Sequence, residues 1–104
     1  MIRWVRARRR RRAEVREAAM DEEFVVVRAD GGEPLAVVFE PMGSEYEVPA
    51  GGYLTIRFMS PPGTSGSVKY RSDYASAGAA VFGTMAAWTA EGAEIDLVTG
   101  CPDW

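Results

Sequence analysis

Residues 53–59, Tyr-Leu-Thr-Ile-Arg-Phe-Met, decide the fold class of this chain. Leu54, Ile56 and Phe58 alternate with residues that can face water, which is the period of a strand with one buried face and one wet face. A stretch with this alternation does not place its apolar residues on one side of a helix. This alternation therefore predicts β-structure.

Runs of the same type lie on both sides of this strand. Upstream, residues 24–28 form a β-branched run that stops at the Asp-Gly-Gly turn of residues 30–32, and residues 35–40 resume it, which is the pattern of a hairpin. Downstream, residues 68–71 and 95–97 alternate between apolar and charged side chains. About seven short strands with frequent turn signals predict an all-β fold, a small antiparallel β-sandwich.

The first 20 residues differ in composition from the rest of the chain. They hold eight of the 12 basic residues and two of the 15 acidic residues, and no glycine or proline follows until residue 31. Arginine, alanine and glutamate are compatible with helix, so we expect a basic N-terminal α-helix. The predicted organisation is a basic helical arm over residues 1–20 and a β-sandwich domain over residues 21–104.

Two other interpretations of this arm stay open. Its positive charge can bind the acidic remainder of the same chain, which carries 13 of the 15 acidic residues. Alternatively, the excess of arginine over lysine and the absence of asparagine and glutamine reflect a GC-rich genome. In that case residues 1–19 are translated upstream sequence and Met20 is the true start.

The strand pattern also predicts which residues form the core. No second helix is long enough to connect parallel strands, so we expect antiparallel pairing. The apolar positions of the predicted strands are Val26, Val37, Phe39, Tyr46, Val48, Leu54, Ile56, Phe58, Val68, Tyr70, Phe82, Ile95 and Leu97.

Composition excludes several classes of function. A chain of 104 residues builds one core, and the absence of histidine removes Ser-His-Asp and Cys-His catalysis and histidine-ligated metals. Cys101 is the single cysteine, so no internal disulfide forms, which favours a reducing cytoplasmic location. No apolar run reaches the length of a transmembrane segment. We expect no cofactor and no metal.

The segment from residue 40 to residue 51 carries a resemblance. Its pattern, E-P-x-G-x-x-Y-x-V-P-x-G, followed by an alternating strand, resembles short uncharacterised bacterial β-sandwich proteins, many of them from GC-rich genomes. The similarity covers about residues 24–98, and the chain has Met42 where such proteins often have tryptophan. The resemblance implies a cupredoxin-like or jelly-roll-like sandwich and no particular activity. The usual copper site would lack its histidines.

Basic and aromatic residues are the candidate binding residues. Five consecutive arginines suit the phosphates of a nucleic acid or another polyanion. Trp4 beside them can stack on a base or attach the arm to the sandwich. Tyr74, Trp88 and Trp104 lie near predicted strand ends, where sandwich proteins often bind their ligands. The arginines of this run are Arg8, Arg9, Arg10, Arg11 and Arg12.

Three hypotheses about function follow. The first is a non-enzymatic interaction module that binds a protein partner or a second copy through the arm and the exposed aromatic or edge-strand surface, with weak polyanion binding by residues 3–12. The second is a small-ligand or carbohydrate-binding β-sandwich. The third is a hydrolase that uses Glu40, Glu45 or Glu47, although alternation places Glu45 and Glu47 on the wet face of a strand. We expect no catalytic residues.

Overall fold

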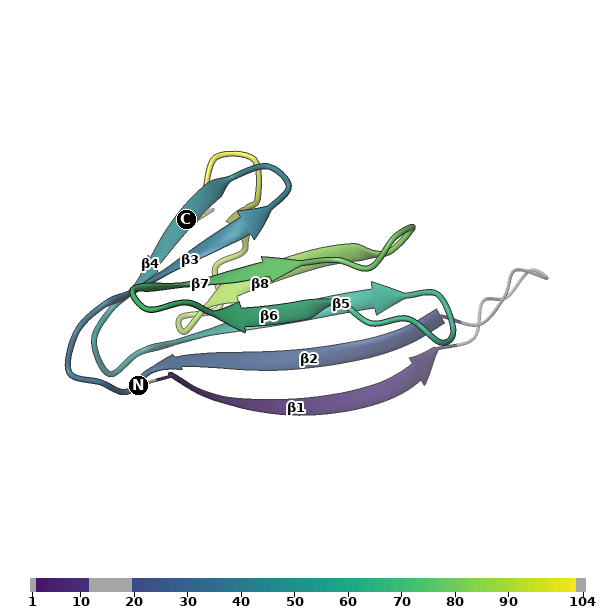
Figure 1. The fold of residues 1–104 in the computed structure, drawn as a ribbon, viewed down its shortest axis with the longest axis horizontal. Coiled ribbons are helices and arrows are strands. Elements are labelled where there is room, and N and C mark those ends of the chain that lie inside the picture. The colour runs from purple at the N-terminus through teal and green to yellow at the C-terminus, as the bar shows by residue number, and fades with distance from the viewer. Residues whose placement is uncertain (1, 12–19, 103–104) are drawn as a thin grey trace.

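Two four-stranded sheets face each other and form the body of the protein (Figure 1). The computed structural model describes residues 2–11 and 20–102, with side chains for residues 20–102. The first sheet has the order β1 (Ile2–Arg11), β2 (Met20–Ala29), β5 (Tyr53–Ser60) and β8 (Thr84–Thr89), and all neighbours are antiparallel. The described residues contain no helix, so the predicted all-β class is confirmed.

The second sheet has the order β4 (Ser44–Val48), β3 (Leu35–Glu40), β7 (Tyr74–Gly78) and β6 (Ser67–Tyr70). Strand β3 is antiparallel to β4 but parallel to β7, so the expectation of antiparallel pairing throughout is wrong at this pair. Parallel strands require a long connection. Here the connection is not a helix, because the chain leaves the second sheet, contributes β5 to the first sheet and returns.

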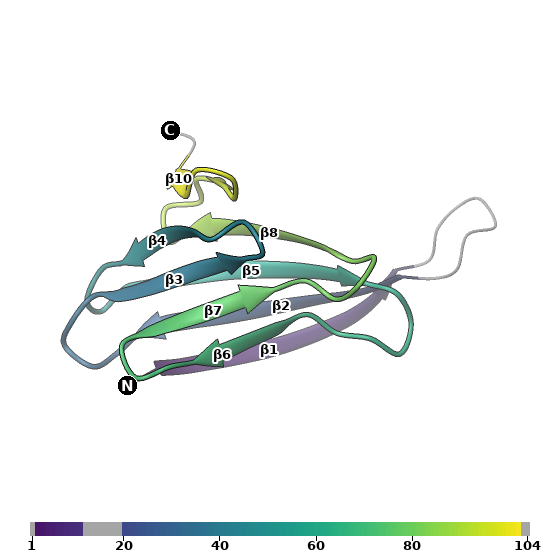
Figure 2. The same ribbon diagram turned by 45° about the horizontal axis from the view of Figure 1, so that its top comes forward.

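A small hairpin of β9 (Ile95–Asp96) and β10 (Cys101–Pro102) follows β8 and brings the described strands to ten (Figure 2). It contacts the edge of β4, where the Ser44 hydroxyl donates a hydrogen bond to the Leu97 carbonyl. Gly100 has a φ of 78°, and a Cβ atom there would lie 2.3 Å from the Glu45 carbonyl oxygen. Only glycine therefore fits this approach of hairpin to strand.

The core lies between the two sheets and consists mostly of residues that alternate along their strands. Seven of the predicted core residues are buried, namely Val37, Phe39, Val48, Leu54, Ile56, Phe58 and Ile95, and Tyr46, Val68 and Leu97 pack against them half-buried. The alternation that predicted β5 is the cause, since its apolar side chains point inward and the others outward.

Three predicted core residues do not belong to the core. Val26 is half-buried on the outer face while Val25 and Val27 are fully buried, because an unbroken valine run does not show which residues point inward. Tyr70 ends the edge strand β6 and is 55% exposed. Phe82 lies in the turn before β8 with a positive φ of 63° and is 92% exposed.

The N-terminal segment is a strand where the structure describes it. Residues 2–11 form β1, paired along its whole length with β2, instead of the predicted helix. A helix would have had no continuous apolar side, since arginines interrupt it, whereas a strand completes the hydrogen bonding of the β2 edge. Residues 12–19, the remainder of the predicted helix, lie outside the described residues.

Candidate interaction surface

The structure separates the residues predicted to bind. Arg8, Arg9, Arg10 and Arg11 belong to β1, and Trp4 pairs in register with Val27. Trp88 lies on β8 in the first sheet, and Tyr74 begins β7 in the second sheet; both are half-buried. Arg12 and Trp104 lie outside the described residues. The predicted residues therefore do not form one site.

The arginine run pairs in register with acidic residues of its own chain. Arg8 is opposite Glu23, Arg9 is opposite Glu22, and Arg10 is opposite Asp21. The three acids are 3%, 1% and 5% exposed. A buried carboxylate is costly unless it is compensated, and opposite charges on adjacent strands stabilise a sheet. This arrangement agrees with the interpretation that the arm folds back onto the acidic remainder of the chain.

The outer side of the first sheet is a different kind of surface. We call it the aromatic face. Its side chains are half-buried, and two aromatic rings each lie beside a guanidinium: the Arg28 carbon Cζ is 5.3 Å from the centre of the Tyr53 ring, and the Arg57 Cζ is 5.4 Å from that of Trp88. Such cation–π pairs stabilise by about 0.5–1 kcal/mol at exposed sites. The face consists of Phe24, Val26, Arg28, Tyr53, Thr55, Arg57, Met59, Ala86 and Trp88.

Strand register explains this composition. Arg28 lies directly opposite Tyr53, and Trp88 lies opposite Thr55, one diagonal step from Arg57. Long side chains on diagonal neighbours of adjacent strands are within reach of each other. The Nε atom of Arg57 is buried and has no hydrogen-bond partner. Among the described residues, both guanidinium groups lie beside aromatic rings and form no salt bridge with a carboxylate.

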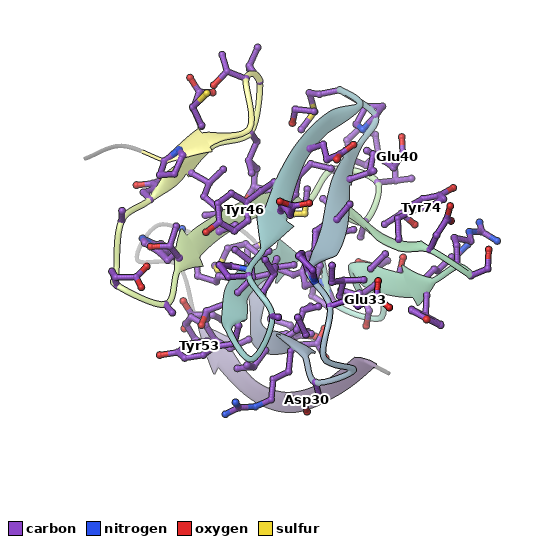
Figure 3. All side chains as sticks on the ribbon, turned by 90° about the vertical axis from the view of Figure 1, so that its left-hand side faces the viewer. Asp30, Glu33, Glu40, Tyr46, Tyr53 and Tyr74 are labelled. Atoms are coloured by element: carbon purple, nitrogen blue, oxygen red, sulfur yellow. The ribbon has the colours of Figure 1, made fainter. Side chains whose placement is uncertain are left out.

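Exposed carboxylates lie almost entirely elsewhere. The described chain has nine exposed acidic residues, and none belongs to a strand of the first sheet. Figure 3 shows two of them, Asp30 and Glu33, in the β2–β3 turn. Glu94 is exposed and borders the aromatic face, because it forms an isolated bridge with Trp88. Exposed carboxylates are therefore scarce on the aromatic face, although the buried Glu22 lies opposite Met59 at its margin.

Two cavities lined by described residues are not aromatic binding pockets. One, of about 240 Å³, lies between the β2–β3 turn and the end of β6 and has Tyr70 as its only aromatic residue. The other, of about 620 Å³, lies between β8 and the C-terminal hairpin and has no aromatic lining. Drug-sized ligands usually occupy apolar or aromatic pockets. Neither of these two cavities offers the enclosed aromatic site that the small-ligand hypothesis requires.

The candidate carboxylates remain at the surface. Glu45 and Glu47 are exposed on β4, with Tyr46 and Val48 turned toward the core between them. Glu40 ends β3 and is exposed as well. No group of three or more potential metal ligands occurs among the described residues. Cys101 is a free, exposed thiol in β10.

The pKa of the Tyr46 phenol is shifted. Burial raises the pKa of its phenol, and the nearby Glu91 carboxylate raises it further because a negative neighbour disfavours the phenolate. The shift accompanies the packing of Tyr46 against the core and does not indicate a catalytic acid.

Sequence reasoning missed Phe24, Arg28, Tyr53 and Arg57 as surface candidates. They occupy outward positions of β2 and β5. The available signal was that these outward positions, unlike those of an ordinary wet face, carry aromatic, valine and methionine side chains.

Comparison with protein-family models, curated proteins and solved structures finds no match to this chain. The described residues include no helix long and apolar enough to cross a membrane.

Proposed function

We propose that the protein is a non-enzymatic interaction module that binds a negatively charged macromolecule through the aromatic face. The observation that carries this proposal is the presence of two cation–π pairs, Arg28 with Tyr53 and Arg57 with Trp88, on the outer side of the first sheet. Exposed arginine and aromatic residues are enriched in binding surfaces, while exposed carboxylates are directed elsewhere in this chain.

Charge supports a polyanion as the partner. In the backbone register Arg3 lies opposite Arg28 and Arg11 lies opposite Met20, so β1 adds arginine positions next to β2. Like charges on adjacent strands repel, and a bound polyanion would relieve that repulsion. The exposed carboxylates on the other surfaces would repel a polyanion, so the protein would meet it with the aromatic face.

The same proposal includes a cytoplasmic location. A cytoplasmic location suits the single free thiol of Cys101. The cupredoxin-like or jelly-roll-like topology and the relation to short bacterial sandwich proteins remain predictions, as does the alternative that Met20 is the start of the chain.

The test uses a fluorescent heparin fragment, which carries repeated negative charge but no bases. We expect the full chain to bind it with an affinity that falls as salt rises. The double variant Arg28→Ser/Arg57→Ser should bind more weakly and with a shallower salt dependence. The matched control is Lys69→Ser/Arg71→Ser, which removes two exposed positive charges at β6 of the second sheet.

Three results would overturn the proposal. The chain could fail to bind heparin even at low salt, or both double variants could weaken binding equally. The third result is that the chain is a dimer at working concentrations and that Arg28→Ser/Arg57→Ser makes it monomeric. The aromatic face would then bind a second copy of the chain.

A further inference from the structure

We infer that the aromatic face binds single-stranded nucleic acid, with bases stacked on its rings and phosphates beside its arginines. This inference rests on the proposed function and names the class of polyanion. It depends on the spacing of the side chains, on the free charge of the guanidinium groups and on the openness of the sheet.

The side chains of the face form rows across the sheet. One row contains Arg28 and Tyr53, the next contains Thr55 and Trp88, and a third contains Arg57. Successive rows lie two residues apart, or about 6.6 Å at a strand's rise per residue. This is roughly twice the 3.4 Å rise per base along one strand of a stacked duplex. Bases must therefore be separated from one another before neighbouring rows can each hold one.

Only unpaired nucleotides offer their bases in that way. In a duplex the flat surfaces of the bases are covered by their neighbours, whereas a single strand can lay successive bases on aromatic rings or guanidinium planes. The outer side of the first sheet presents both kinds of plane, with Arg28 opposite Tyr53 and Arg57 opposite Phe24. An open sheet accommodates an extended strand of nucleotides without a preformed cavity.

The arginines can serve the phosphates while they remain beside the rings. Each guanidinium has five N–H donors, and stacking on a ring uses its plane rather than these donors. The Arg57 Nε atom has no acceptor in the structure. A phosphate beside Arg57 would therefore add charge-assisted hydrogen bonds to its remaining N–H groups without removing an existing ion pair with a described carboxylate.

Glu94 provides a second, independent test of this geometry. It is exposed and bridges Trp88 at the margin of the face. A carboxylate beside a stacked nucleotide repels its phosphate. Replacing Glu94 with glutamine should therefore tighten binding of a phosphate-bearing strand, whereas the same change at the exposed Glu47 on the second sheet should not.

The experiment compares three labelled probes on the full chain: a thymidine oligonucleotide, an abasic strand of the same length, and heparin. We expect the thymidine strand to bind more tightly than the abasic strand and to quench tryptophan fluorescence. Trp88→Leu should weaken thymidine-strand binding about 5- to 150-fold, the usual effect of losing one stacked base, and leave heparin binding nearly unchanged. Phe82→Leu, which alters an aromatic residue far more exposed than Trp88, is the matched control.

The outcomes separate this inference from the proposed function. If the thymidine and abasic strands bind equally, or Trp88→Leu weakens heparin binding as much as thymidine binding, base stacking is overturned while polyanion binding stands. If no probe binds, both fail. Because Trp88 is half-buried, the urea midpoint of each variant is measured as well. If Trp88→Leu does not fold, the test rests on Glu94→Gln. Unchanged affinity of Glu94→Gln for the thymidine strand then overturns the inference.

Discussion

Reversing the charge of three β1 arginines should strongly destabilise the protein. The variant is Arg8→Glu/Arg9→Glu/Arg10→Glu, and its targets lie opposite three carboxylates of β2 that are at most 5% exposed. An opposite-charge pair across two strands stabilises by roughly 0.2–1 kcal/mol, and a like-charge pair destabilises by a similar amount. Three reversals therefore cost about 1–6 kcal/mol, and poor solvation of the carboxylates favours the upper half of that range.

Urea unfolding followed by tryptophan fluorescence measures this loss. A domain of this size has a free energy of unfolding of about 5–15 kcal/mol, so the midpoint should fall clearly. Arg3→Glu is the matched control because Arg3 lies opposite Arg28, where a negative charge removes a repulsion. We expect this control to be as stable as the parent or slightly more stable.

Pair-specific rescue tests the register itself. Adding Glu23→Arg to Arg8→Glu restores an opposite-charge pair, whereas adding Asp21→Arg to Arg8→Glu does not, since Asp21 lies opposite Arg10. Rescue by the first combination alone supports the pairing. Equal rescue by both, or a triple reversal as stable as the parent, would refute the argument from register and favour a helical arm without fixed partners.

Further predictions concern the core, the C-terminal hairpin and a titrating phenol. Phe39→Ala should cost about 3–5 kcal/mol in urea unfolding, since Phe39 is fully buried, whereas Phe82→Ala should change stability by less than about 0.5 kcal/mol because Phe82 is 92% exposed. Gly100→Ala should lower the thermal midpoint more than Gly92→Ala: both glycines have positive φ, but only at Gly100 would the new Cβ meet a backbone oxygen, at 2.3 Å. Stability should fall as pH rises above about 10, since a raised phenol pKa means that the folded state holds its proton more tightly than the unfolded chain, and Tyr46→Phe should flatten that fall in urea midpoints measured across pH.

The alternation in residues 53–59 was sufficient to predict β5 and its buried side. A two-residue period is a local property, and the burial of Leu54, Ile56 and Phe58 follows directly from it. The four-residue run from Phe24 to Val27 has no such period, so the sequence predicted a strand there but placed Val26 on the wrong side. Local composition identifies strands more readily than it identifies their inward residues.

Local sequence patterns could not predict which distant strands pair. The parallel contact of β3 with β7 joins segments separated by two other strands of the second sheet and one of the first. Strand β1 could not be predicted for the same reason. Arginine and alanine favour helix locally, and only the acids opposite them on β2 favour a strand. Trp88 was identified as a surface candidate, but its neighbour Arg57 belongs to another strand and could not be connected to it.

The arginine run and the aromatic face play different parts in the proposed binding, and this affects how a shortened chain is interpreted. Arg8, Arg9 and Arg10 lie in register opposite acids of β2. Starting the chain at Met20 would remove them and also turn β2 into an edge strand, so reduced binding by such a chain would reflect a weakened sheet as much as lost charge. Arg28→Ser/Arg57→Ser leaves the strand pairing in place and removes two guanidinium groups from the face. If that variant keeps its stability and loses polyanion binding, the surface is the sheet face and β1 is its structural support.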